Sequence, residues 1–71
     1  MTDSQYLVTL GSKIKELRNT KKITQQDLAR LCDFEKASMS RIESGRTNTT
    51  ILTLLKISKV LEVPLQDLFK E

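Results

Sequence analysis

Residues 23–45 read ITQQDLARLCDFEKASMSRIESG, a pattern that predicts two short helices with a tight turn between them. Thr24 is a typical helix N-cap, because its hydroxyl can accept a hydrogen bond from the backbone N–H of Asp27. The first helix of the pair is expected over residues 25–32. Asp33 is expected at the turn, since Asp is among the few residues other than glycine that tolerate a left-handed backbone.

The second helix of the pair is expected over residues 36–44, and Gly45 suits its end because glycine adopts positive φ without strain. A helix-turn-helix needs apolar contacts between its helices and a small residue where they approach each other. Ala29 is that small residue. The apolar contacts are expected from Leu28, Cys32, Phe34, Met39 and Ile42. The stretch therefore predicts that the first helix fixes the angle of the second, whose polar face stays free.

Three further helices are expected around this pair. Residues 5–20 carry apolar side chains at spacings of three and four, which is typical of one helix face. A helix over residues 51–61 ends before Pro64, because proline disfavours helix in the residue that precedes it. Its apolar stripe is expected to contain Ile51, Leu54, Leu55, Ile57 and Leu61. With a short last helix over residues 65–70, the predicted class is all-α, one compact five-helix domain over residues 1–71.

Composition fits a small globular domain and excludes several kinds of chemistry. The chain is 38% hydrophobic and 30% charged, and it has no His and one Cys. The commonest general base and a zinc-binding set are therefore missing, and no glycine-rich phosphate loop is present. We expect no enzyme, no cofactor and no metal site, and Cys32 should be a small buried hydrophobe. Without a signal-peptide pattern or an apolar run near about 20 residues, we expect a cytoplasmic protein and no membrane partner.

Positive charge is concentrated in the middle of the chain. The net charge is +3, and residues 13–22 and 36–46 are basic whereas residues 60–71 are acidic. This distribution suits a polyanionic partner on one face, although a mixed solvated surface would give the same totals.

The polar face of the second paired helix carries candidates for DNA base contacts. These are Lys36, Ala37, Ser40 and Arg41. Residues near the start of a recognition helix point into the major groove, where Arg41 could bind guanine through two hydrogen bonds and Ala37 could touch a thymine methyl group. The alternative is that these side chains only solvate the helix.

Several motifs carry a family resemblance from about residue 10 to 69. They are LR at 17–18, TQQDLA at 24–29, SRIESG at 40–45, and LLKISKVLEV at 54–63 followed by LQDLF at 65–69. The sequence resembles the phage-repressor-like, xenobiotic-response-element (XRE) family of helix-turn-helix DNA-binding proteins. The resemblance implies a lambda-repressor-like domain that binds a double-stranded DNA operator as a homodimer.

Matching positions imply individual roles within this family pattern. Lys36, Ala37 and Arg41 would face bases, and Arg18 and Glu43 would form a salt bridge between the first and third helices. The implied phosphate contacts are Gln25, Ser38, Arg46, Thr47 and Asn48.

Three positions depart from the family pattern. Asp33 stands where a turn glycine is usual, which is tolerable. Glu35 stands where Ser or Thr is usual, and its charge close to the expected phosphates would weaken binding or narrow the range of sequences bound. Lys36 replaces a common Gln and leaves the base preference open.

Two apolar sets are candidates for a dimer surface. The first contains Val63, Leu65, Leu68 and Phe69, which could equally close the monomer core. The second contains Tyr6, Leu7 and Val8. The expected function is a sequence-specific transcriptional regulator that binds a near-palindromic operator as a dimer. The alternatives are a restriction–modification controller, an antitoxin with a toxin partner, or a protein-interaction module that has lost DNA binding.

Overall fold

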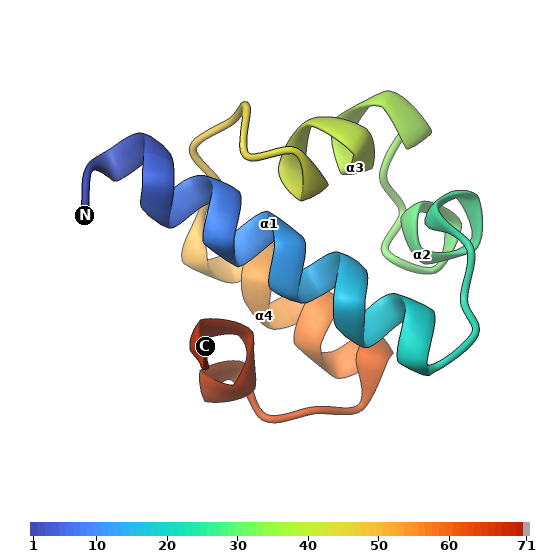
Figure 1. The fold of residues 1–71 in the computed structure, drawn as a ribbon. Coiled ribbons are helices and arrows are strands. Elements are labelled where there is room, and N and C mark those ends of the chain that lie inside the picture. The colour runs from blue at the N-terminus through green and yellow to red at the C-terminus, as the bar shows by residue number, and fades with distance from the viewer. Residues whose placement is uncertain (71) are drawn as a thin grey trace.

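The computed structural model describes residues 1–70, and within them helices are the only regular secondary structure. Its elements are α1 (Asp3–Thr20), α2 (Gln25–Leu31), α3 (Lys36–Glu43), α4 (Ile51–Leu61) and the 3-10 helix η1 (Leu65–Phe69). Figure 1 shows α1 crossing the molecule, with α3 on one side of it and α4 and η1 on the other. The predicted all-α class is confirmed. None of the helices in the described part of the chain is both long and apolar enough to span a membrane.

The helix boundaries differ from the sequence prediction by one or two residues: α1 begins two residues earlier than expected, and α2, α3 and the last helix each end one residue earlier. α1 begins at Asp3 because Thr2 and Gln5 form a capping box, in which each side chain accepts a hydrogen bond from the backbone N–H of the other. The last element is a 3-10 helix rather than an α-helix, so the expected five helices are four α-helices and one 3-10 helix. Only five residues form it after Pro64, and short segments of this kind commonly take the tighter 3-10 geometry.

The same kind of turn follows each of the four α-helices. Each turn places one residue at positive φ: Lys22 at 59°, Asp33 at 60°, Gly45 at 74° and Glu62 at 58°. The N–H of the next residue then donates to the carbonyl five positions earlier, at 2.8–3.0 Å, which satisfies an otherwise free helix-end carbonyl. The expectations for Asp33 and Gly45 are confirmed, and those turns set the directions of α3 and of the segment that leads to α4.

One contiguous core joins the helices. It contains Ile14, Leu28, Ala29, Cys32, Met39, Ile42, Leu54, Ile57, Leu61 and Leu68, with Phe34 packed against its edge. The apolar set expected for the helix pair is therefore confirmed. Ile51 was expected in the buried stripe of α4, but it is 58% exposed because it occupies the first position of the helix, at the end of the molecule. Burial raises the pKa of the Cys32 thiol, and the charge of Lys56 opposes this shift only in part, as expected of a small buried hydrophobe.

A close approach of α1 to α3 depends on Gly11. A Cβ atom at this position would overlap the backbone carbonyl oxygens of Ile42 and Glu43 at the end of α3. Backbone atoms cannot swing aside as a flexible side chain can. Gly11 therefore sets how near α3 lies to α1.

We expect Gly11→Ala to lower the free energy of unfolding by roughly 2 kcal/mol, because the added methyl group forces α1 and α3 apart. Ser12→Ala is the matched control, since Ser12 is exposed on the same helix. Urea denaturation of both variants checks this expectation. A Gly11→Ala variant as stable as the control would show that the helices can separate without cost.

Candidate nucleic-acid interface

In the helix pair, α2 packs against α3 and covers its inner face. Leu28 and Ala29 are the buried residues of α2, and Met39 and Ile42 are buried on α3. The Ala29 carbonyl also accepts the N–H of Phe34 at 2.8 Å, which closes the turn between the helices. Figure 1 shows α2 and α3 at an angle to each other at one end of the molecule. The pair therefore has the helix-turn-helix geometry that the sequence predicted.

The opposite face of α3 is open to solvent. Lys36, Ala37, Ser40 and Arg41 are all exposed. Arg41 Nη2 donates to Ser38 Oγ at 3.3 Å, which is long for such a bond, and Ser44 Oγ donates to the Arg41 carbonyl at 3.2 Å. The four base-contact candidates thus share one accessible surface on a helix whose position is fixed from behind.

The loop after α3 lies next to this surface. Ser38 and Arg41 line a hollow of about 180 Å³ together with Thr47 and Asn48. Arg46 and Asn48 are exposed, and Thr47 is half-buried. The structure therefore brings four predicted contact residues, from the helix and the loop, to the rim of one hollow. Gln25 lies apart from this group, at the start of α2.

Arg18 and Glu43 form a buried ion pair between α1 and α3. Arg18 Nε donates to Glu43 Oε2 at 2.8 Å, and Arg18 Nη2 donates to Glu43 Oε1 at 3.0 Å. Their side chains are only 9% and 3% exposed. Arg18 Nη1 donates to the Ile23 carbonyl at 2.9 Å, so the pair also fixes the connection between α1 and α2. Two parallel bonds between a guanidinium and a carboxylate are stronger and more directional than a single contact.

Gln25 is a third member of this cluster, which sequence reasoning missed. Its Nε2 donates to Glu43 Oε1 at 3.2 Å, and the residue is half-buried. The two residues are 18 positions apart, and no local pattern pairs a glutamine with a carboxylate at that separation. The expected phosphate contact of Gln25 would therefore be made by a side chain that already has a partner.

Glu35 occupies the N-cap position of α3 and leaves its carboxylate unused. Its side chain makes no capping hydrogen bond, and it takes part in none of the ion pairs found among residues 1–70. Ser or Thr at this position would bond to the backbone of the first turn. Glu35 instead remains exposed beside the open face of α3.

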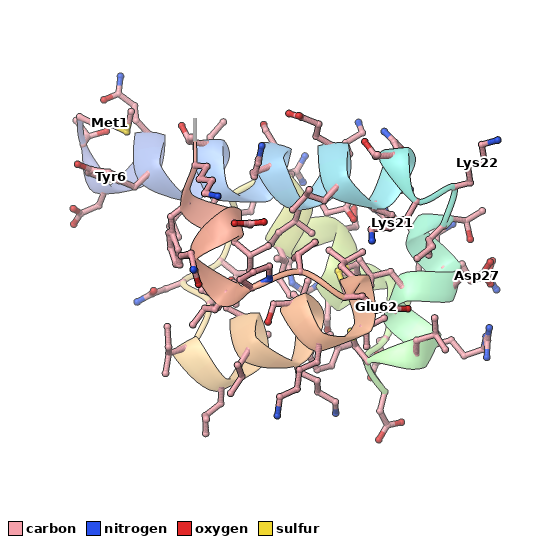
Figure 2. All side chains as sticks on the ribbon, turned by 90° about the horizontal axis from the view of Figure 1, so that it is seen from below. Met1, Tyr6, Lys21, Lys22, Asp27 and Glu62 are labelled. Atoms are coloured by element: carbon pink, nitrogen blue, oxygen red, sulfur yellow. The ribbon has the colours of Figure 1, made fainter. Side chains whose placement is uncertain are left out.

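The cations of the basic middle segment are not all free. Arg18 is held in the buried pair, and Lys13 lies 3.7 Å from Glu16. Lys21 and Lys22 remain exposed at the end of α1 that faces away from Met1 and Tyr6 (Figure 2). Only part of the positive charge counted from the sequence can therefore meet a polyanion.

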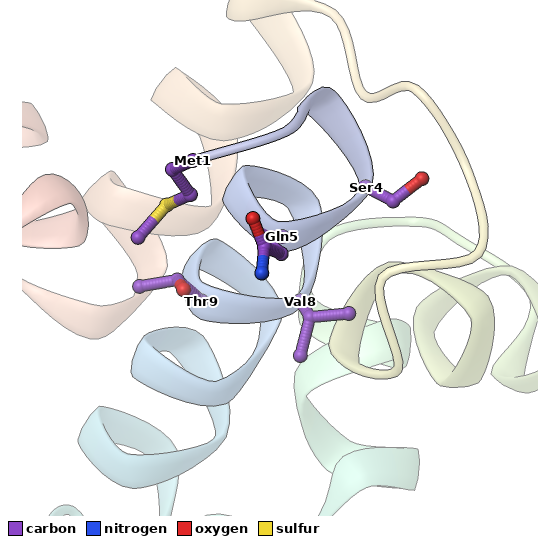
Figure 3. A pocket seen from close by; sticks show the side chains of 5 residues that line it. All are labelled: Met1, Ser4, Gln5, Val8 and Thr9. Atoms are coloured by element: carbon purple, nitrogen blue, oxygen red, sulfur yellow. The ribbon is translucent and has the colours of Figure 1, made fainter.

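A second surface, at the other end of α1, is apolar. Tyr6 (61%) and Phe69 (55%) are exposed there and line one hollow, and Ile51 (58%) and Leu52 (74%) are exposed at the start of α4; we call these four side chains the apolar end. Figure 1 shows the starts of α1 and α4 and the C-terminal turn gathered there. A shallow hollow of about 550 Å³ near the start of α1 is lined by side chains without charge, those of Met1, Ser4, Gln5, Val8 and Thr9 (Figure 3).

The dimer candidates divide between the core and this surface. Leu68 is 1% exposed and belongs to the monomer core, and Val63 and Leu65 pack against that core half-buried. Phe69 alone of this first set is mainly exposed. In the second set Tyr6 and Val8 are exposed, whereas Leu7 is half-buried. Neither Ile51 nor Leu52 was predicted for this surface: Ile51 was assigned to the buried stripe of its helix, and Leu52 was assigned to no surface.

Known proteins resemble this chain in sequence and in structure. A sequence model described as helix-turn-helix, HTH_3, matches residues 14–68. The control protein C.MunI of Mycoplasma is 34% identical over 65 residues, which span 90% of this chain and 88% of that protein. The control protein C.BamHI of Bacillus amyloliquefaciens is 37% identical over 59 residues, 82% and 73% of the two chains. The crystal structure of the restriction-modification controller C.AhdI from Aeromonas hydrophila superimposes with a TM-score of 0.86 at 30% identity, covering 89% and 96%.

We expect Glu43→Ala to lower Tm by more than about 10 °C, because it leaves the buried guanidinium of Arg18 without its partner. Glu35→Ala removes an equal charge that is exposed and unpaired, and it should change Tm by only a few degrees. Thermal unfolding followed by circular dichroism distinguishes the two variants. Equal shifts would contradict the structural role of the pair.

Proposed function

Because the chain belongs to the helix-turn-helix family HTH_3, we propose that it is a transcriptional regulator that binds double-stranded DNA sequence-specifically through α3. The observation that carries this proposal is the division of α3 into two faces. Met39, Ile42 and Glu43 are buried against the rest of the domain. Lys36 and Arg41 are exposed on the other side, and neither takes part in an ion pair within residues 1–70.

In the proposed complex, α3 enters the major groove with its first turns against the base edges. Arg41 suits guanine, whose O6 and N7 accept two parallel hydrogen bonds from a guanidinium. Its long bond to Ser38 is weak enough to be exchanged for such a contact. Ala37 presents a methyl group that fits against thymine, and Lys36 reaches either guanine or a phosphate.

The proposed phosphate contacts flank this helix on both sides. Ser38, Arg46, Thr47 and Asn48 lie at the rim of the hollow or in the loop beside it, and Gln25 lies at the start of α2. Hydroxyl, amide and guanidinium groups are the usual donors to phosphate oxygens, and such contacts fix the register of a protein on the duplex.

A selection of bound fragments from random DNA, followed by gel shifts on the selected site, tests the proposed function. We expect the affinity to fall with salt with a log–log slope of about −0.9 for each phosphate contact. Arg41→Ala should reduce discrimination at one base position about tenfold. Lys59→Ala is the matched control, since it removes an exposed cation from α4, on the far side of α1. Unchanged base preference in Arg41→Ala would refute the recognition role of α3.

We further propose that two copies associate through the apolar end and bind a near-palindromic site. Tyr6, Ile51, Leu52 and Phe69 give this end four large exposed apolar side chains, more than a solvated surface requires. A two-fold dimer would place two α3 helices in successive major grooves, about 34 Å apart.

Sedimentation at micromolar concentration checks the proposed dimer. We expect the wild type to sediment as a dimer and Leu52→Glu as a monomer, because the variant buries a charge in the interface. Leu31→Glu is the matched control, since Leu31 is 50% exposed on α2 at the opposite end of the molecule. A monomeric wild type, or dissociation by both substitutions alike, would rule out this surface.

A second candidate role is control of restriction–modification genes. Three similar proteins that span most of this chain are named control or controller proteins, two of them at 34% and 37% identity. Selection on fragments of the source genome distinguishes this role, since the bound site would lie beside such genes. No comparable observation favours the antitoxin. The protein-interaction module rests on the unused carboxylate of Glu35 alone.

A further inference from the structure

We propose that Glu43, besides pairing with Arg18, positions Gln25 to bind a DNA phosphate, an inference that rests on the proposed function. Glu43 is thus assigned as a positioning residue, which acts on DNA through Gln25 without touching it. The buried ion pair would then serve DNA binding directly as well as stability.

The geometry of the Glu43 carboxylate carries this inference. Oε2 accepts Arg18 Nε at 2.8 Å, while Oε1 accepts both Arg18 Nη2 at 3.0 Å and Gln25 Nε2 at 3.2 Å. The Glu43 side chain is 3% exposed, so it has almost no freedom to move. Gln25 is therefore attached to a point that α1 and α3 together hold fixed.

This attachment determines which way the Gln25 amide faces. An ionised carboxylate only accepts hydrogen bonds, so the NH₂ group and not the carbonyl of Gln25 must point to Glu43. One N–H is used in that contact, and the second stays available. Because Gln25 is half-buried rather than buried, the second N–H can reach a partner outside the protein.

The charge balance of the cluster makes an anionic partner acceptable there. A lone carboxylate behind Gln25 would repel a phosphate. Arg18 neutralises Glu43 through its two parallel bonds, so Gln25 lies in front of a neutral pair. A surface glutamine without a partner in the protein would lose side-chain entropy on binding DNA. Gln25 has already lost part of this entropy on folding, because it is bonded to Glu43.

Gln26 offers an internal comparison. It is the next residue of α2, it is exposed, and it takes part in none of the side-chain hydrogen bonds found among residues 1–70. Side-chain amide NMR signals of the free protein should show slow hydrogen exchange and restricted motion for Gln25 but not for Gln26. Identical behaviour of the two amides would overturn the proposal.

A double-mutant cycle on a DNA fragment selected with the wild type tests the functional step. Gln25→Ala should weaken binding about fivefold, the effect of one hydrogen bond, without changing base preference. Glu43→Asp withdraws the carboxylate from Gln25 while keeping its charge near Arg18, and it should weaken binding by a similar factor. Gln25→Ala in the Glu43→Asp background should then cost less than about twofold, because the amide is no longer positioned.

The controls separate positioning from stability and from the proposed function itself. Ile57→Val destabilises the core from α4 and removes no polar group, so it should leave binding unchanged where the protein is folded. An equal Gln25→Ala penalty in both backgrounds would overturn the proposal, and so would the absence of any penalty in the wild-type background. In both cases the DNA-binding function would stand. A wild-type protein that selects no DNA would refute both the positioning role of Glu43 and the proposed DNA-binding function. If Glu43→Asp does not fold, the NMR comparison in the wild type decides.

Discussion

The buried ion pair between Arg18 and Glu43 is the interaction on which the arrangement of α3 depends. Glu43 ends α3, where the helix dipole disfavours an anion, so its carboxylate needs a cationic partner. Arg18 supplies this partner from α1 and also bonds to the connection that leads into α2. With an apolar core built from so few residues there is little surplus stability, and one directional contact can fix an angle that packing alone would leave loose.

Features set by neighbouring residues were predictable from the sequence. The cap at Thr24, the left-handed turn at Asp33 and the buried face of the helix pair all follow from side-chain chemistry within a few positions. The capping box of Thr2 and Gln5 belongs with these, because its spacing is a recognised helix-start signature that could have been used. Sequence patterns cannot show that Ile51 lies at an open end of the molecule or that Gln25 reaches Glu43, since both depend on how distant segments meet.

The open face of α3 carries basic side chains and, at its start, one acidic side chain. In the part of the chain that the structure describes, its cations Lys36 and Arg41 form no ion pair, whereas Arg18 is paired with Glu43 in the interior. Glu35 stands at the start of the same helix with an unused charge. In the proposed complex this carboxylate would lie near DNA phosphates and lower the affinity for all sequences alike.

The four left-handed turns have a consequence for how the chain reaches this structure. Each turn is closed by a hydrogen bond between residues only five positions apart, so reversing the chain requires no distant contact. Folds dominated by such near-neighbour contacts have low contact order and fold fast. The packing of η1 against α1 joins the two ends of the described chain and carries the largest loop-closure entropy. We expect this docking to form last, after the helix pair has acquired its angle.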